Sequence, residues 1–65
     1  MDNVSKTEVL LNILNMVLTK ALYFKDNVSI KKLSDLRHAI YYGEFNYNVT
    51  LNSLREIEGN LSKYE

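Results

Sequence analysis

The chain contains no cysteine and only one histidine among its 65 residues. The absence of cysteine excludes disulfide bonds, thiolate metal sites and catalysis by a thiol. A single histidine also excludes a histidine-rich metal site, so we expect no metal and no other cofactor. A chain this short buries only about 60% of the surface that its unfolded form exposes. Without disulfides or a metal, a partner chain is the stabilising device that remains.

Neither sign of charge is in excess, because eight basic residues balance eight acidic ones. A dedicated nucleic-acid-binding protein is normally basic, since phosphate contacts supply most of its non-specific affinity. Hydrophobic residues make up 46% of the chain, which is enough for a core. The composition therefore favours one folded domain, residues 1–65, and makes nucleic acid a weaker candidate than protein as its partner.

No stretch of the sequence is typical of a targeting or membrane segment. The first residues lack the basic region of a secretory leader. The most apolar run, residues 9–24, is interrupted by asparagine and lysine and is short for a bilayer. We therefore expect a cytoplasmic protein without membrane contact. Abundant asparagine, lysine, isoleucine and tyrosine are typical of AT-rich genomes, which suggests a low-GC bacterium, a phage or another mobile element.

The triplet Asn-x-Ser/Thr recurs along the chain, beginning at Asn3, Asn27, Asn48 and Asn60. It is the acceptor pattern for N-glycosylation, but it has no chemical role in a protein without a leader peptide. A helix start explains the first three copies better, because a serine or threonine hydroxyl can accept a hydrogen bond from the first turn. The expected N-caps are Ser5, Ser29 and Thr50.

Apolar residues around these caps support the same interpretation. One precedes each cap and another follows four residues later, which is the spacing of a hydrophobic staple. Glu8, three residues after Ser5, also completes a capping box. The staple pairs are Val4 with Val9, Val28 with Leu33, and Val49 with Leu54. These signals predict an all-α fold of three helices at about residues 6–25, 30–42 and 51–63.

The first expected helix is apolar around most of its circumference. A surface helix normally presents an apolar stripe only a little wider than about 100°, so this helix needs cover from several sides. Two amphipathic helices would leave a third flank as an apolar patch of the kind found at interfaces. A second copy is the simplest cover, and we expect a homodimer through this helix. The seam would use Leu11, Leu14, Leu18, Ala21 and Leu22.

An aromatic connector, residues 44–49, separates the second and third helices. Gly43 can take the left-handed conformation that ends a helix. Apolar and polar residues then alternate strictly, which predicts an extended segment. Tyrosine is common at interfaces because it combines a large apolar area with a polar tip. The aromatic residues here either cap the core or bind a partner; they are Tyr41, Tyr42, Phe45 and Tyr47.

Three basic residues break the local rules of the second helix. Lys31 and Lys32 stand in the expected first turn, where the helix dipole favours acidic residues. Arg37 falls inside the apolar arc. Together with Lys25 they could form a basic patch near one end of the helix. The patch would bind an acidic protein surface or the phosphates of a nucleic acid; alternatively, its side chains are simply solvated.

No catalytic constellation is visible in the sequence. His38 has Asp35 three residues before it, but nothing supplies a nucleophile or a ligand set. Glu56 and Glu58 point in different directions on a helix. We therefore expect a small non-enzymatic protein-interaction module, such as an inhibitor, antirepressor or adaptor that occupies a surface on another protein. The alternatives are a dimeric DNA-binding transcriptional regulator and a self-associating structural or assembly subunit.

Overall fold

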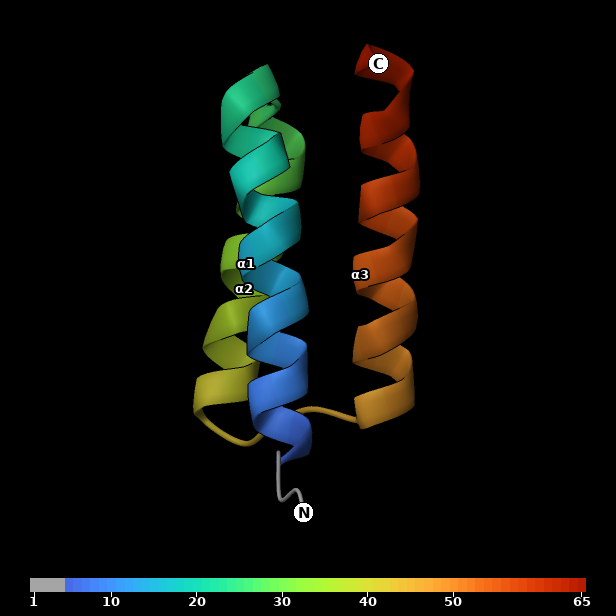
Figure 1. Ribbon diagram of the computed structural model, residues 1–65. Coiled ribbons are helices and arrows are strands. Elements are labelled where there is room, and N and C mark those ends of the chain that lie inside the picture. Colours follow the sequence, from blue (N-terminus) through green and yellow to red (C-terminus); the bar gives the residue numbers. More distant parts are fainter. Residues whose placement is uncertain (1–4) are drawn as a thin grey trace.

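The computed structural model describes residues 5–65, which fold into a bundle of three helices (Figure 1). α1 covers Lys6–Phe24, α2 covers Asn27–Tyr41 and α3 covers Tyr47–Leu61. A short 3-10 helix, η1, follows at Ser62–Tyr64. The helices run up, down and up, so α2 is antiparallel to both of the others. The predicted all-α fold of three helices is confirmed.

α1 begins at the cap that the sequence predicts. The Ser5 hydroxyl accepts a hydrogen bond from the Glu8 N–H at 3.1 Å, and the Glu8 carboxylate accepts one from the Ser5 N–H at 3.3 Å. This capping box satisfies two donors that would otherwise be unpaired at the helix start. Val4, the expected staple partner of Val9, lies outside the described residues.

α2 and α3 begin earlier than predicted, because a different side chain caps each of them. Asp26, not Ser29, is the N-cap of α2, and its carboxylate accepts hydrogen bonds from the Ser29 N–H at 3.3 Å and the Ser29 hydroxyl at 3.1 Å. Asn46, not Thr50, caps α3 and accepts from the Val49 N–H at 3.1 Å. Aspartate and asparagine cap helices at least as well as serine and threonine. In both helices the acceptor that comes earlier in the sequence is therefore the N-cap.

These earlier starts correct two further expectations. Val28 is 66% exposed and Val49 is 63% exposed, so neither forms the predicted staple. The connector expected over residues 44–49 is also shorter. Of these six residues only 44–46 are non-helical. Residues 47–49 belong to the first turn of α3. The alternation of apolar and polar residues there does not produce an extended strand.

α1 is the central helix of the bundle. It packs against both α2 and α3, whereas α2 and α3 meet each other along fewer residues. The core is purely aliphatic, and Phe45 and Tyr47 pack against its edge. Much of the apolar circumference of α1 is therefore covered within a single chain. The buried core residues are Leu10, Leu14, Val17, Ala21, Leu33, Ile40, Leu54, Ile57 and Leu61.

Both turns between helices use a residue in the left-handed conformation. Lys25 ends α1 with a φ of 58°, and α2 starts only two residues later. Gly43 follows α2 with a φ of 71°, as the sequence predicts. Glycine takes this conformation without steric cost, but a residue with a Cβ atom does not. The first turn therefore carries backbone strain that the second avoids.

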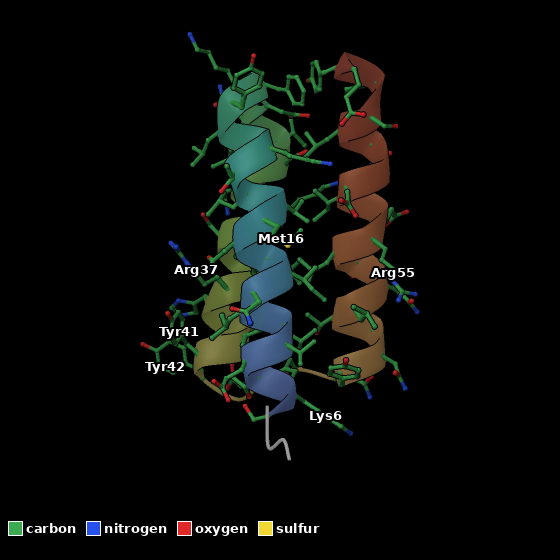
Figure 2. All side chains as sticks on the ribbon, in the orientation of Figure 1. Lys6, Met16, Arg37, Tyr41, Tyr42 and Arg55 are labelled. Atoms are coloured by element: carbon green, nitrogen blue, oxygen red, sulfur yellow. The ribbon has the colours of Figure 1, made fainter. Side chains whose placement is uncertain are left out.

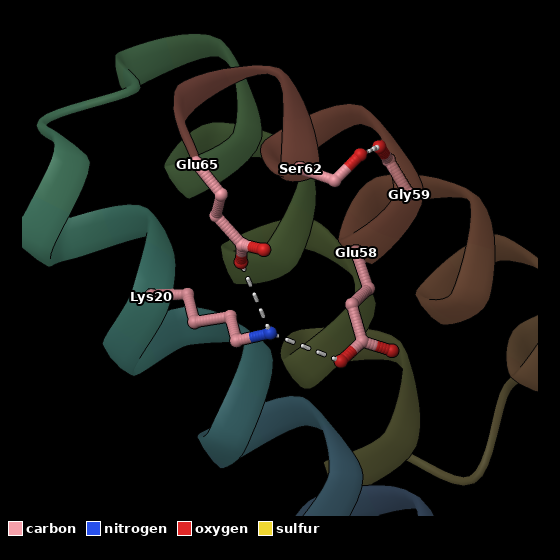
Figure 3. Close-up of polar contacts among 5 residues, drawn as sticks. All are labelled: Lys20, Glu58, Gly59, Ser62 and Glu65. Carbon is pink, nitrogen blue, oxygen red and sulfur yellow. Dashed lines mark hydrogen bonds and ion pairs between the residues drawn. The ribbon is translucent and has the colours of Figure 1, made fainter.

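The C-terminal turn is tied to α1 by ion pairs (Figure 3). Lys20 Nζ lies 3.4 Å from Glu58 Oε2 and 3.7 Å from Glu65 Oε2. The Ser62 hydroxyl donates a hydrogen bond to the Gly59 carbonyl at 2.6 Å. The three ion-paired side chains are about half exposed, so each pair contributes less than about 1 kcal/mol. These contacts orient the turn more than they stabilise it.

Candidate protein-interaction site

Four side chains at the C-terminal end of α2 form the candidate site, called the α2 surface from here on: Arg37, His38 and Tyr41 of the helix and its C-cap residue, Tyr42. Tyr41 is 70% exposed and Tyr42 is 68% exposed. The centroids of the His38 and Tyr42 rings are 4.5 Å apart. Figure 2 shows Arg37, Tyr41 and Tyr42 together on the side of α2 that faces away from α3.

An open depression of about 460 Å³ runs along the α2 surface. Its lining places a guanidinium, a carboxylate and an imidazole beside a tyrosine ring. The helical repeat explains the grouping, because residues three and four apart share one side of a helix. All of the lining residues come from one helix, so the depression suits contact with another protein better than enclosure of a small ligand. They are Ser34, Asp35, Arg37, His38 and Tyr41.

The four aromatic residues predicted as a group separate into two pairs. Tyr41 and Tyr42 belong to the exposed α2 surface, whereas Phe45 and Tyr47 pack against the edge of the core. Tyr47 also faces α1, where Lys6 Nζ lies 5.4 Å from its ring centroid. The interpretation as core caps therefore fits the second pair and does not apply to the first.

The predicted basic residues do not share one surface. Lys31 Nζ lies 3.2 Å from the Asp35 carboxylate on the outside of α2. Lys32 borders a groove between α2 and α3, whereas Arg37 lines the depression on the α2 surface. Lys25 lies in the turn between α1 and α2. Successive residues on a helix are rotated by about 100°, which disperses the three cations of α2 around its axis.

The residues of the dimer seam predicted on α1 differ in how deeply they are buried. Leu14 and Ala21 are fully buried in the core of the chain itself. Leu11 and Leu18 are partly buried against the same core, and Leu22 is 56% exposed. A seam through Leu14 would therefore face the interior of one chain and not a second copy.

His38 belongs to the α2 surface but was not predicted as an interface residue. In the sequence it was weighed with Asp35 as a catalytic pair and set aside. In the structure its ring packs on that of Tyr42, four residues later. The available signal was this i, i+4 spacing, which brings two rings together on one side of a helix.

Within residues 5–65, histidine, aspartate and glutamate side chains form no group of three that could hold a metal ion. In the same part of the chain, no helix has the length and apolar character needed to cross a membrane. Neither known protein families nor curated proteins nor solved structures give a significant match to this chain.

Proposed function

We propose that this protein is a small non-enzymatic interaction module that binds another protein through the α2 surface, as an inhibitor, antirepressor or adaptor does. The observation that supports this most directly is the exposure of Tyr41 and Tyr42, at 70% and 68%, beside Arg37. Tyrosine and arginine are enriched among the few residues that dominate protein–protein binding energy. Two large adjacent rings left in solvent have no role in the core of this bundle.

The tyrosines and the arginine of the α2 surface have different roles in the proposed complex. The two tyrosine rings offer apolar area at low cost in side-chain entropy, and their hydroxyls remain available for hydrogen bonds. Arg37 offers a planar guanidinium that pairs with a carboxylate or stacks on an aromatic ring.

Charge supports an acidic partner surface. Lys31 is paired with Asp35 and Lys32 borders the groove towards α3, so Arg37 is the cation that the α2 surface presents. A carboxylate of the partner would pair with this guanidinium.

A double variant tests the proposal. Tyr41→Ala/Tyr42→Ala removes both rings, and Tyr23→Ala is the matched control because Tyr23 is 80% exposed at the opposite end of the bundle. We expect the wild-type chain and the control to retain one protein from a cell extract in stoichiometric amount. With that protein purified, the double variant should bind at least about 30-fold more weakly, since a dominant interface residue contributes about 2 kcal/mol or more. Equal loss of affinity in the control and the double variant would contradict the proposed site.

DNA binding by a dimeric regulator is the competing proposal. The dispersal of Lys31, Lys32 and Arg37 around α2 counts against it, because affinity for DNA is built from a continuous basic stripe. A gel shift with mixed duplex DNA at low salt separates the two proposals. Binding that weakens steeply with salt would favour the regulator, and no binding even at low salt eliminates it.

A further inference from the structure

The groove between α2 and α3 is a second surface, which contains none of the four residues of the α2 surface and adjoins its depression at Asp35. It has a volume of about 300 Å³ and is lined by Leu36 and Ile57. Lys32 and Asp35 border it from α2, and Ser53 and Glu56 border it from α3. The groove exists because α2 and α3 both pack mainly on α1 and contact each other less.

Exposed apolar side chains extend this face beyond the groove. Val28 stands four residues before Lys32 and therefore lies on the same side of α2. Val49 stands seven residues before Glu56, two helical turns away, and lies on the same side of α3. Both valines are more than 60% exposed. Because α2 and α3 are antiparallel, the two valines lie at opposite ends of one face.

The two borders of the groove carry opposite charges. Lys32 on α2 and Glu56 on α3 line the same groove, so they lie at similar heights along the bundle. Neither of them takes part in the ion pairs that the structure describes. A two-fold axis parallel to the helices would lay α2 of one copy over α3 of another. That operation brings each Lys32 to the partner's Glu56 and each Asp35 to the partner's Ser53.

We propose that the α2–α3 face binds a second copy of this chain about a two-fold axis parallel to the helices, with Lys32 of each copy paired to the partner's Glu56. The arrangement is isologous, so every favourable pair occurs twice. Val28 and Val49 gain apolar cover at the two ends of the interface. This inference goes beyond the proposed function, because it uses a different face of α2 and leaves Tyr41 and Tyr42 exposed.

Charge reversal tests the pairing. We would measure solution mass by light scattering at low ionic strength over a range of concentrations. The wild-type chain should show twice its mass of 7.6 kDa. Lys32→Glu alone and Glu56→Lys alone should each shift the protein to a single chain, because each places like charges opposite each other twice. An equimolar mixture of the two variants should restore the doubled mass, because both contacts in the mixed dimer are then attractive.

Arg55→Glu is the matched control, since it makes the same change of charge as Lys32→Glu at a position of α3 outside the groove lining. It should leave the doubled mass unchanged, and circular dichroism should show native helicity in every variant. A single-chain mass for the wild type at all concentrations would overturn the proposal. So would a Glu56→Lys variant that still dimerises, because that result indicates a two-fold axis across the helices, where Lys32 meets the partner's Asp35.

Discussion

The rings of Phe24 and Tyr64 stack with their centroids 5.0 Å apart and their planes inclined by 17°. Tyr23 adds an edge-to-face contact on Phe24, with a centroid distance of 5.1 Å. The stack joins the end of α1 to η1, forty residues further along the chain. Together with the ion pairs of Lys20, it therefore holds the C-terminal turn on the bundle.

Removing this stack should destabilise the fold measurably. We expect Tyr64→Ala to lower the free energy of unfolding by about 1 kcal/mol or slightly more, because an aromatic pair contributes about 0.5–1.5 kcal/mol beyond the area it buries. Urea unfolding followed by circular dichroism measures the change. Tyr41→Ala is the control, since Tyr41 is 70% exposed, and it should change stability by less than about 0.5 kcal/mol. Equal effects of the two variants would show that the stack contributes nothing.

Asp26 should make stability depend on pH in the acidic range. The hydrogen bond from the Ser29 N–H lowers the pKa of Asp26 below its ordinary value of 3.8, and Tyr64, the Ser29 hydroxyl and Lys63 act in the same direction. Burial acts in the opposite direction but does not prevail. The folded-state pKa is thus below the unfolded one, so this contribution is fully present above the unfolded pKa.

The same contribution is lost as the pH falls from about 4 through the folded pKa of Asp26. Asp26→Asn keeps an oxygen that can cap α2 but removes the charge. We expect its stability to decline less steeply below pH 4 than that of the wild type, as measured by urea unfolding at successive pH values. Identical slopes for the two proteins would mean that Asp26 titrates equally in the folded and unfolded states.

The strained turn after α1 can be relieved. Lys25 holds a φ of 58°, a conformation that costs about 1–2 kcal/mol for a residue with a Cβ atom. Lys25→Gly removes that cost but adds flexibility to the unfolded chain, which offsets about 0.5–1 kcal/mol. We expect a net gain of about 0.5–1 kcal/mol in thermal or urea unfolding. Lys25→Ala retains the strain and should give no comparable gain.

The two glycines should respond to alanine in opposite ways. A Cβ atom at Gly59 would meet nothing within 4 Å, and the residue lies inside α3. Gly59→Ala should therefore stabilise the protein by about 1 kcal/mol through helix propensity alone. Gly43 is equally open, but its φ is 71°, so Gly43→Ala should destabilise. A loss of stability in Gly59→Ala would indicate a contact on α3 that a single chain does not contain.

The repeated cap and staple signals were sufficient to predict three helices, but they did not fix where two of the helices begin. Asp26 and Ser29 are three residues apart and both types of side chain suit an N-cap, but only Ser29 was predicted as one. In the structure Asp26 is the cap, and Ser29 donates its N–H and its hydroxyl to the Asp26 carboxylate. Asn46 and Thr50 presented the same ambiguity for α3.

The α2 surface was predictable in part. Tyr41, Tyr42, Phe45 and Tyr47 were predicted as one group, but the structure leaves the first two exposed and packs the other two against the edge of the core. The alternation that joined them in the sequence does not form a strand. The dispersal of Lys31, Lys32 and Arg37 around α2 follows from the helical rotation per residue, so it could have been predicted from the sequence. Arg37 lies beside apolar positions, yet it is exposed, because its long side chain carries the charge out to solvent.

The two-residue turn at Lys25 and Asp26 also has a consequence for the order of events in folding. It allows α1 and α2 to pair through contacts between residues close in sequence, whereas α3 reaches α1 across a separation such as the 38 residues between Lys20 and Glu58. Local contacts form with little loss of loop entropy, and helical bundles of this kind fold in microseconds to milliseconds. The α1–α2 hairpin should therefore form first and α3 dock last. The amides of α3 should accordingly be the first in the bundle to exchange with solvent.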